Sequence, residues 1–82
     1  MMELKDTVEM MLSSDYKERF KAEYWQLKIR HDRLQKMVDN WDNLDFIPTC
    51  SYDIYVRQLW AMEDYMECLI DRAKQEKVEL DD

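Results

Sequence analysis

The chain has 82 residues, a formal net charge of −7 and a charged fraction of 38%, with no glycine and a single proline. A chain of this length supports one core, and the lack of glycine excludes phosphate-binding glycine loops, glycine-turn hairpins and most compact β architectures. The acidic excess repels the nucleic-acid backbone, so neither DNA nor RNA is expected as a partner. We therefore predict a single all-α domain over residues 1–82.

Several other classes of protein are also disfavoured. No apolar run approaches the roughly 20 residues that cross a bilayer, and the first residues lack the apolar core of a signal peptide, so no membrane partner is expected. Cys50 and Cys68 are too few for a disulfide framework and are expected to be small apolar fillers. His31 is the only histidine, and without a Cys/His cluster we expect no metal site, no cofactor and no catalytic site.

A short amphipathic helix is predicted over residues 4–12. Its apolar positions are spaced i, i+4, i+7 and i+8, which places them on one face of a helix. The polar segment 13–15 then interrupts the pattern, and either Ser14 or Asp15 is placed to cap a new helix.

The next helix is long and is predicted over residues 15–42. Its apolar positions, with the histidine counted among them, recur at spacings of four, four, three, four, three, four and three residues, which is a heptad seam. These positions are Tyr16, Phe20, Tyr24, Leu27, His31, Leu34, Val38 and Trp41.

A turn over residues 43–50 holds Pro48, which does not fit inside a helix. Thr49 or Ser51 is placed to cap a second long helix over residues 51–77, and an acidic tail over 78–82 follows. This helix has its own seam with spacings of three and four. The seam consists of Tyr52, Tyr55, Leu59, Met62, Met66, Leu69 and Ala73.

The two seams fit one antiparallel register. Pairing Trp41 with Tyr52 at the turn places Phe20 beside Ala73 at the open end, and every intermediate seam residue also finds a partner. The predicted shape is a long antiparallel helical hairpin preceded by a short helix. A second group of apolar residues lies off the seam, so we expect the hairpin to assemble into an oligomeric helical bundle. This group is Trp25, Ile29, Met37, Ile54, Val56, Trp60 and Ile70.

Basic groups gather on the first long helix. Residues 15–43 carry seven Lys or Arg against six acids, whereas residues 44–82 carry four against ten. The register brings Lys17, Lys21 and Arg72 to the open end of the hairpin, near a helix N-terminus and several aromatic rings. These groups suit the phosphates and flat bases of a small nucleotide, but they also suit ordinary solvated charges over core aromatics.

A second cluster is predicted at mid-hairpin, around two tryptophans. It admits two interpretations, an inter-subunit pocket or aliphatic side-chain stems that cover the indole rings, and the second is favoured. The cluster contains Lys28, Arg30, Arg57 and Gln58 beside Trp25 and Trp60.

Nearly the whole chain resembles a known group of proteins. Residues 4–30 look like the opening of small phage and prophage proteins, and the segments 57–59, 61–66 and 69–73 resemble their second half. Those proteins are similar in plan to helical-hairpin immune-evasion proteins of phages, which oligomerise and sequester the cyclic nucleotides of bacterial CBASS and Thoeris defences. The resemblance implies a nucleotide sponge in the cytoplasm of the bacterial host.

Two functional hypotheses follow. In the first, the protein is a non-enzymatic homo-oligomer that binds a cyclic dinucleotide or a cyclic ADP-ribose-type signal by stacking and phosphate neutralisation. The expected ligand-binding residues are Tyr16, Lys17, Lys21, Tyr24, Tyr65 and Arg72. In the second, the protein is an oligomeric adaptor or an acidic mimic that binds and inhibits a host protein.

Overall fold

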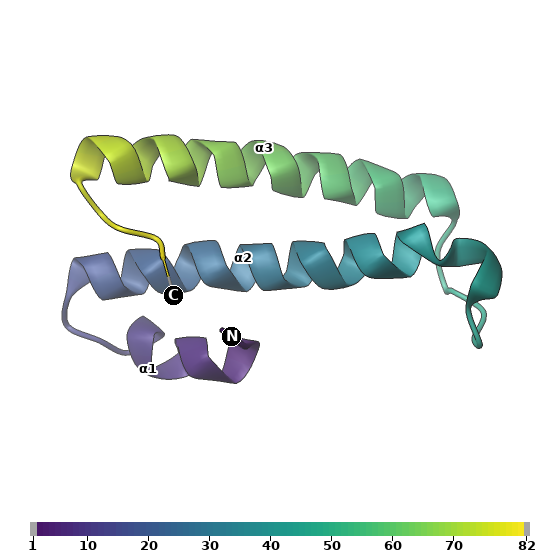
Figure 1. The fold of residues 1–82 in the computed structure, drawn as a ribbon, viewed down its shortest axis with the longest axis horizontal. Helices are drawn as coiled ribbons and strands as arrows, with labels where there is room; N and C mark the ends of the chain where they lie inside the picture. Colours follow the sequence, from purple (N-terminus) through teal and green to yellow (C-terminus); the bar gives the residue numbers. More distant parts are fainter. Residues whose placement is uncertain (1, 82) are drawn as a thin grey trace.

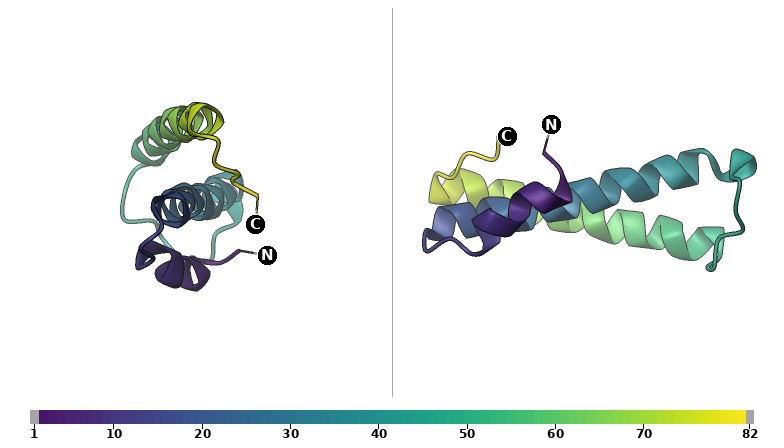
Figure 2. Two further views of the ribbon diagram at one scale, coloured as in Figure 1. Left: turned by 90° about the vertical axis from the view of Figure 1, so that its left-hand side faces the viewer. Right: turned by 90° about the horizontal axis from the view of Figure 1, so that it is seen from below.

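The computed structural model describes residues 2–81, and within them all regular structure is helical. The elements are η1 (Leu4–Asp6), α1 (Thr7–Met11), α2 (Tyr16–Asp39), η2 (Trp41–Asn43) and α3 (Tyr52–Glu76), where η denotes a 3₁₀ turn. Helices α2 and α3 lie side by side and antiparallel, and α1 packs on the opposite side of α2 (Figures 1 and 2). The predicted all-α class, with a short N-terminal helix before a long hairpin, is confirmed.

Local chemistry sets the ends of α2. Asp15 has an extended backbone, and its carboxylate accepts a 2.9 Å hydrogen bond from the backbone N–H of Lys17, which satisfies one of the free donors of the first turn. At the other end the side-chain amide of Asn40 donates to the carbonyl of Lys36 over 2.8 Å. The chain then tightens into η2 instead of continuing as α-helix.

Two of the predicted seam pairs can be followed at opposite ends of the hairpin. Near the turn, the ring centroids of Trp41 and Tyr52 are 5.3 Å apart in an edge-to-face arrangement. Near the open end, Phe20 and Ala73 belong to one buried cluster with Leu69, which is 1% exposed. The seam therefore holds the two long helices in the predicted register.

The segment after α3 forms part of the core. Lys77 adopts the left-handed conformation (φ 58°, ψ 45°), and the backbone N–H of Val78 then donates to the carbonyl of Ala73 over 2.9 Å, as in a Schellman cap. Val78 is buried against the Phe20 cluster. Figure 1 shows the chain crossing from α3 to α2 beyond this point, where the carbonyl of Leu80 accepts a 2.7 Å bond from the Trp25 indole.

Replacing Lys77 with glycine is expected to raise the free energy of unfolding by about 1 kcal/mol, because only glycine takes the left-handed conformation without a steric penalty. Urea denaturation followed by circular dichroism measures the change. Lys74→Gly is the matched control, since Lys74 lies in α3, where glycine is expected to lower the free energy of unfolding by roughly 0.5–1 kcal/mol. A Lys77→Gly protein as destabilised as this control would contradict the cap.

The contact between α1 and α2 depends on small buried side chains and on a buried hydroxyl whose hydrogen bonds are all formed within the protein. Thr7 and Ala22 are completely buried, and alanine at position 22 leaves room for the two helices to approach. The Thr7 hydroxyl donates to the carbonyl of Leu4 over 2.7 Å and accepts from the side-chain amide of Gln26 over 3.1 Å. The N-terminal helix is thus fixed to α2 by hydrogen bonds as well as by packing.

Several large apolar side chains remain at the surface of the single chain. Trp60 is 63% exposed, Leu12 is 79% exposed, and Ile47 in the turn is 93% exposed.

The expectation that the two cysteines fill apolar space is wrong, because both are exposed. Cys68 precedes the buried Leu69, and consecutive helical residues point about 100° apart, so it faces away from the seam. Among residues 2–81, no helix is long and apolar enough to traverse a lipid bilayer.

Candidate functional site

The open end of the hairpin carries a connected polar cluster that joins α2 to α3. The Arg72 guanidinium donates to the Tyr16 hydroxyl over 2.7 Å and to the Glu76 carboxylate over 3.1 Å. Tyr16 in turn donates to Glu76 over 2.7 Å, which closes a three-membered ring of hydrogen bonds. The guanidinium also lies over the Phe20 ring, 4.6 Å from its centroid, in a cation–π contact. Arg72 is therefore held beside an aromatic face by hydrogen bonds to residues on both long helices.

These contacts fix the charge of the cluster. The hydrogen bond to Glu76 is the main cause that raises the pKa of Tyr16 above its usual 10, so the phenol stays protonated at neutral pH. The same bond is the main cause that lowers the pKa of Glu76. A bond from Tyr65 to the carboxylate of Glu23 raises the pKa of Tyr65 in the same way, while the nearby charge of Arg72 opposes this rise. At neutral pH Arg72 is therefore a cation, Glu76 is a carboxylate, and Tyr16 and Tyr65 are neutral phenols.

Of the six expected ligand-binding residues, the structure joins Tyr16 directly to Arg72 and places Tyr65 within the electrostatic reach of Arg72. Lys17 and Lys21 lie farther round α2, about 100° and 140° from Tyr16 at 100° per residue. The Lys21 ammonium is 4.0 Å from the carboxylate of Glu18.

The sixth residue, Tyr24, packs against the buried cluster, and its ring meets that of Trp25 edge-on at 5.5 Å. The expected residues thus divide between two sides of the hairpin seam.

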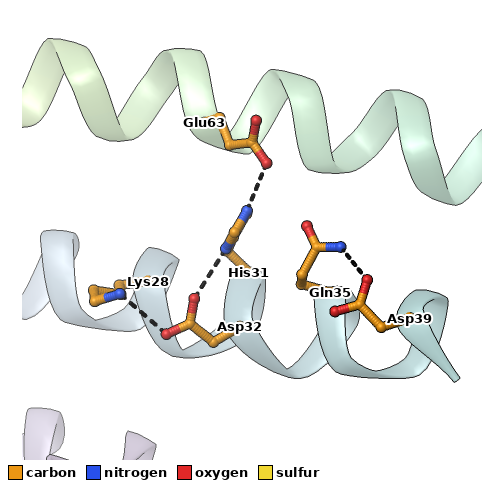
Figure 3. Close-up of polar contacts among 6 residues, drawn as sticks. All are labelled: Lys28, His31, Asp32, Gln35, Asp39 and Glu63. Atoms are coloured by element: carbon orange, nitrogen blue, oxygen red, sulfur yellow. Dashed lines mark hydrogen bonds and ion pairs between the residues drawn. The ribbon is translucent and has the colours of Figure 1, made fainter.

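A second polar cluster lies at mid-hairpin (Figure 3). The two ring nitrogens of His31 lie 2.9 Å from a carboxylate oxygen of Glu63 on α3 and 3.0 Å from one of Asp32. The Lys28 ammonium is 3.1 Å from the other oxygen of Asp32. The His31 side chain is only 12% exposed, so it forms the polar interruption of an otherwise apolar seam. The bond from His31 on α2 to Glu63 on α3 places the histidine between the two long helices, as the predicted seam requires.

Burial and hydrogen bonding have opposite effects on His31. Partial burial by itself lowers the pKa of His31, but the bonds to Glu63 and Asp32 and the charges of these carboxylates outweigh it and raise the pKa above its usual 6.5. Burial likewise favours a higher pKa for Asp32, yet the bonds from His31 and Lys28 lower it overall. His31 is therefore more readily protonated in the folded hairpin than in the unfolded chain.

This shift predicts a pH dependence of stability. A histidine whose pKa is raised by folding contributes fully below its unfolded pKa of about 6.5, and the contribution is lost as the pH rises through the folded pKa. We therefore expect the hairpin to become less stable as the pH is raised from about 6 to about 8. His31→Gln keeps a polar group without a titration in this window and is expected to remove this slope. Thermal melts of both proteins at several pH values measure it, and equal slopes would refute the assignment.

A pocket of about 440 Å³ lies on α2 beside the start of the chain. Trp25 and Lys28 belong to the predicted mid-hairpin cluster, for which a covering role is favoured, but the spacing of the sequence does not predict that the other lining residues meet there. The lining residues are Met2, Glu3, Trp25, Lys28, Ile29, Asp32, Arg33 and Lys36. Helical spacing alone shows that one face of α2 carries Trp25, Ile29 and Lys36. It does not show that residues 2–3 lie beside this face, because their position depends on how α1 folds back onto α2.

Residues 2–81 contain no group of three or more histidine, cysteine, aspartate or glutamate side chains arranged to hold a metal ion. At the open end, the guanidinium of Arg72 lies beside the face of Phe20, and a cation beside an aromatic ring is a pairing that anions and flat rings favour.

Comparison with known protein families identifies a family match. The model of the Sequestin family matches residues 14–75, which include α2, the turn and nearly all of α3. No curated protein and no solved structure shows a significant match. The matched region covers most of the chain and contains both seams of the hairpin. The chain therefore belongs to the Sequestin family, a binding family associated with the sequestration of a signalling molecule.

Proposed function

We propose that the protein binds a cyclic nucleotide immune signal and sequesters it without cleaving it. The observation that carries the proposal is the family match over residues 14–75. In this proposal the protein is a phage immune-evasion protein that acts in the cytoplasm of the bacterial host. Its ligand is a cyclic dinucleotide or a cyclic ADP-ribose-type signal of CBASS or Thoeris defence.

The open end of the hairpin offers the two kinds of group that such a ligand needs. A phosphate favours charged donors, and a base favours flat rings. The proposed ligand-binding residues are Tyr16, Lys17, Lys21, Tyr24, Tyr65 and Arg72. Arg72 is already positioned over Phe20, so an incoming phosphate has only to replace the contacts of its guanidinium with Glu76 and Tyr16. Affinity then depends on exchanging one set of charge-assisted bonds for another.

Self-association is part of the proposal. The single chain leaves Ile54, Trp60 and Leu12 substantially exposed, and burying such side chains between copies is favourable. A homo-oligomer also provides more than one ligand site per particle, which suits sequestration. Light scattering at micromolar concentration is expected to give a mass above that of one chain. A strictly monomeric mass would contradict self-association.

Thermal melting against a panel of ligands tests the proposed function. The panel contains cyclic dinucleotides, cyclic trinucleotides and cyclic ADP-ribose isomers. A ligand present at 100 times its Kd stabilises the folded state by about 2.7 kcal/mol, which shifts the melting temperature by roughly 10–20 °C in a domain of this size. A shift with one ligand supports the proposal and identifies the signal, and no shift with any ligand contradicts it.

Lys21→Glu is expected to abolish binding of that ligand while leaving the helical content unchanged, because the charge reversal repels phosphate. Within residues 2–81, the ion pair of Lys21 is a 4.0 Å contact with the half-exposed Glu18, so its replacement removes little that holds the fold together. Lys5→Glu, which makes the same change on η1, is the matched control and is expected to bind normally. Isothermal titration measures both affinities, and an unchanged affinity for the Lys21 variant excludes Lys21 from the site.

The alternative is an adaptor or acidic mimic that inhibits a host protein. The observation that favours it is the charge of residues 44–82, ten acids against four bases, together with the exposed Trp60 indole. Capture from host lysate is then expected to recover one stoichiometric protein, and a mimic is expected to lose it as the salt concentration rises.

A further inference from the structure

The pocket between α2 and the first residues of the chain points to a second binding site, and we propose that it takes a small anion that carries a flat or apolar group. None of the six residues proposed for the open end of the hairpin lines this pocket. The inference therefore goes beyond the proposed function and does not depend on it.

The charge of the pocket differs from that of the chain. Its lining contains three cations and two carboxylates, which gives a local net charge of +1 in a protein of net charge −7. Asp32 is already occupied by Lys28 at 3.1 Å and by His31 at 3.0 Å. Glu3 lies 3.6 Å from the Lys5 ammonium, outside the pocket lining. Both carboxylates therefore have cationic or histidine partners.

Two of the three cations are available to a ligand. The Arg33 and Lys36 side chains form no hydrogen bond or ion pair with the other described residues, although both line the pocket. Positions 33 and 36 are three residues apart on α2, which places them on neighbouring parts of the helix surface. A guanidinium and an ammonium at this spacing suit a phosphate or a similar anion.

The apolar side of the pocket is fixed in place. The Trp25 indole N–H donates to the carbonyl of Leu80 over 2.7 Å, and the ring also meets Tyr24 edge-on. Ile29 lies one turn along the same face of α2. A ring held by two neighbours loses little freedom when a ligand packs on it, so it is a prepared surface for a flat group. The volume of about 440 Å³ lies in the range of small-molecule sites.

Backbone amide NMR with isotopically labelled full-length protein tests the site directly. The probe is ADP, which combines a flat base with a charged diphosphate, and its two parts are tested alone as adenosine and inorganic pyrophosphate. We expect ADP to shift the amides of residues 25–36 and the Trp25 indole signal, which Trp25→Phe identifies by its loss. We expect each part alone to bind about tenfold more weakly, since neither uses both sides of the pocket.

Charge reversal tests the role of the free cations. The double variant Arg33→Glu/Lys36→Glu is expected to reduce ADP affinity by at least about tenfold. The control variant is Arg57→Glu on α3, which reverses the charge of one arginine outside the pocket lining. It is expected to bind ADP normally. Circular dichroism verifies that each variant keeps its helices. ADP shifts confined to residues 16–24 and 65–76, or no shifts at millimolar ADP, would overturn the inference.

Discussion

Leu69→Ala is expected to lower the free energy of unfolding by about 3 kcal/mol, within the 2–5 kcal/mol that such truncations cost in buried sites. Leu69 is 1% exposed and lies in the cluster that joins α2, α3 and the segment after α3. The lost methyl groups leave a cavity between long helices that cannot easily close. In a small protein, whose total stability is of order 5 kcal/mol, a change of this size removes most of the margin.

The matched control is Leu12→Ala, because Leu12 is 79% exposed after α1. It is expected to change the free energy of unfolding by less than about 0.5 kcal/mol. Urea denaturation of both variants, at a protein concentration held constant, gives the comparison. Equal effects at the two positions would mean that the Phe20 cluster is not the centre of the fold. A large effect at Leu12 alone would instead point to its burial between copies.

Val78→Asp is the second change with a large expected effect, a loss of about 3 kcal/mol or more. Val78 is 8% exposed within the Phe20 cluster, and a carboxylate there loses its hydration without gaining a partner. Release of residues 78–81 from the core also exposes the Trp25 indole, whose N–H donates a hydrogen bond to the carbonyl of Leu80. The variant is therefore expected to melt at a lower temperature and to show altered tryptophan fluorescence before the helices unfold.

Val8→Asp, at a 48% exposed position of α1, makes the same chemical change where water can solvate the charge. Its expected effect on the melting temperature is small. If Val78→Asp were equally mild, the segment 78–81 would be a dispensable tail and not a part of the core.

The hairpin could be predicted because its causes are local and periodic. Two seams of matching length, separated by a segment with Pro48, permit few arrangements, and the Trp41–Tyr52 contact confirms the one with the fitted register. The return of the chain after α3 was not predicted, because it depends on a non-glycine residue, Lys77, in the left-handed conformation. An acidic segment gives no sign that one of its few apolar residues, Val78, is buried.

The candidate sites were harder to predict for a different reason. Residue types at the open end suggested cations beside aromatic rings, and the structure does place Arg72 over Phe20. The partners that already occupy that guanidinium, Tyr16 and Glu76, depend on side-chain geometry that helical spacing does not fix. The pocket beside Trp25 depends on where α1 turns back, which no periodicity encodes. Periodicity finds the faces of helices, while sites arise where separate segments meet.

Recovery of the bound ligand distinguishes sequestration from cleavage. The protein is incubated with the cyclic nucleotide that gives the largest thermal shift, separated from free ligand by gel filtration, and heated to release what it holds. Chromatography with mass measurement then identifies the released compound. We expect the intact cyclic nucleotide to be recovered in a fixed ratio to the protein. Recovery of a linear or otherwise altered nucleotide, or of none at all, would contradict it.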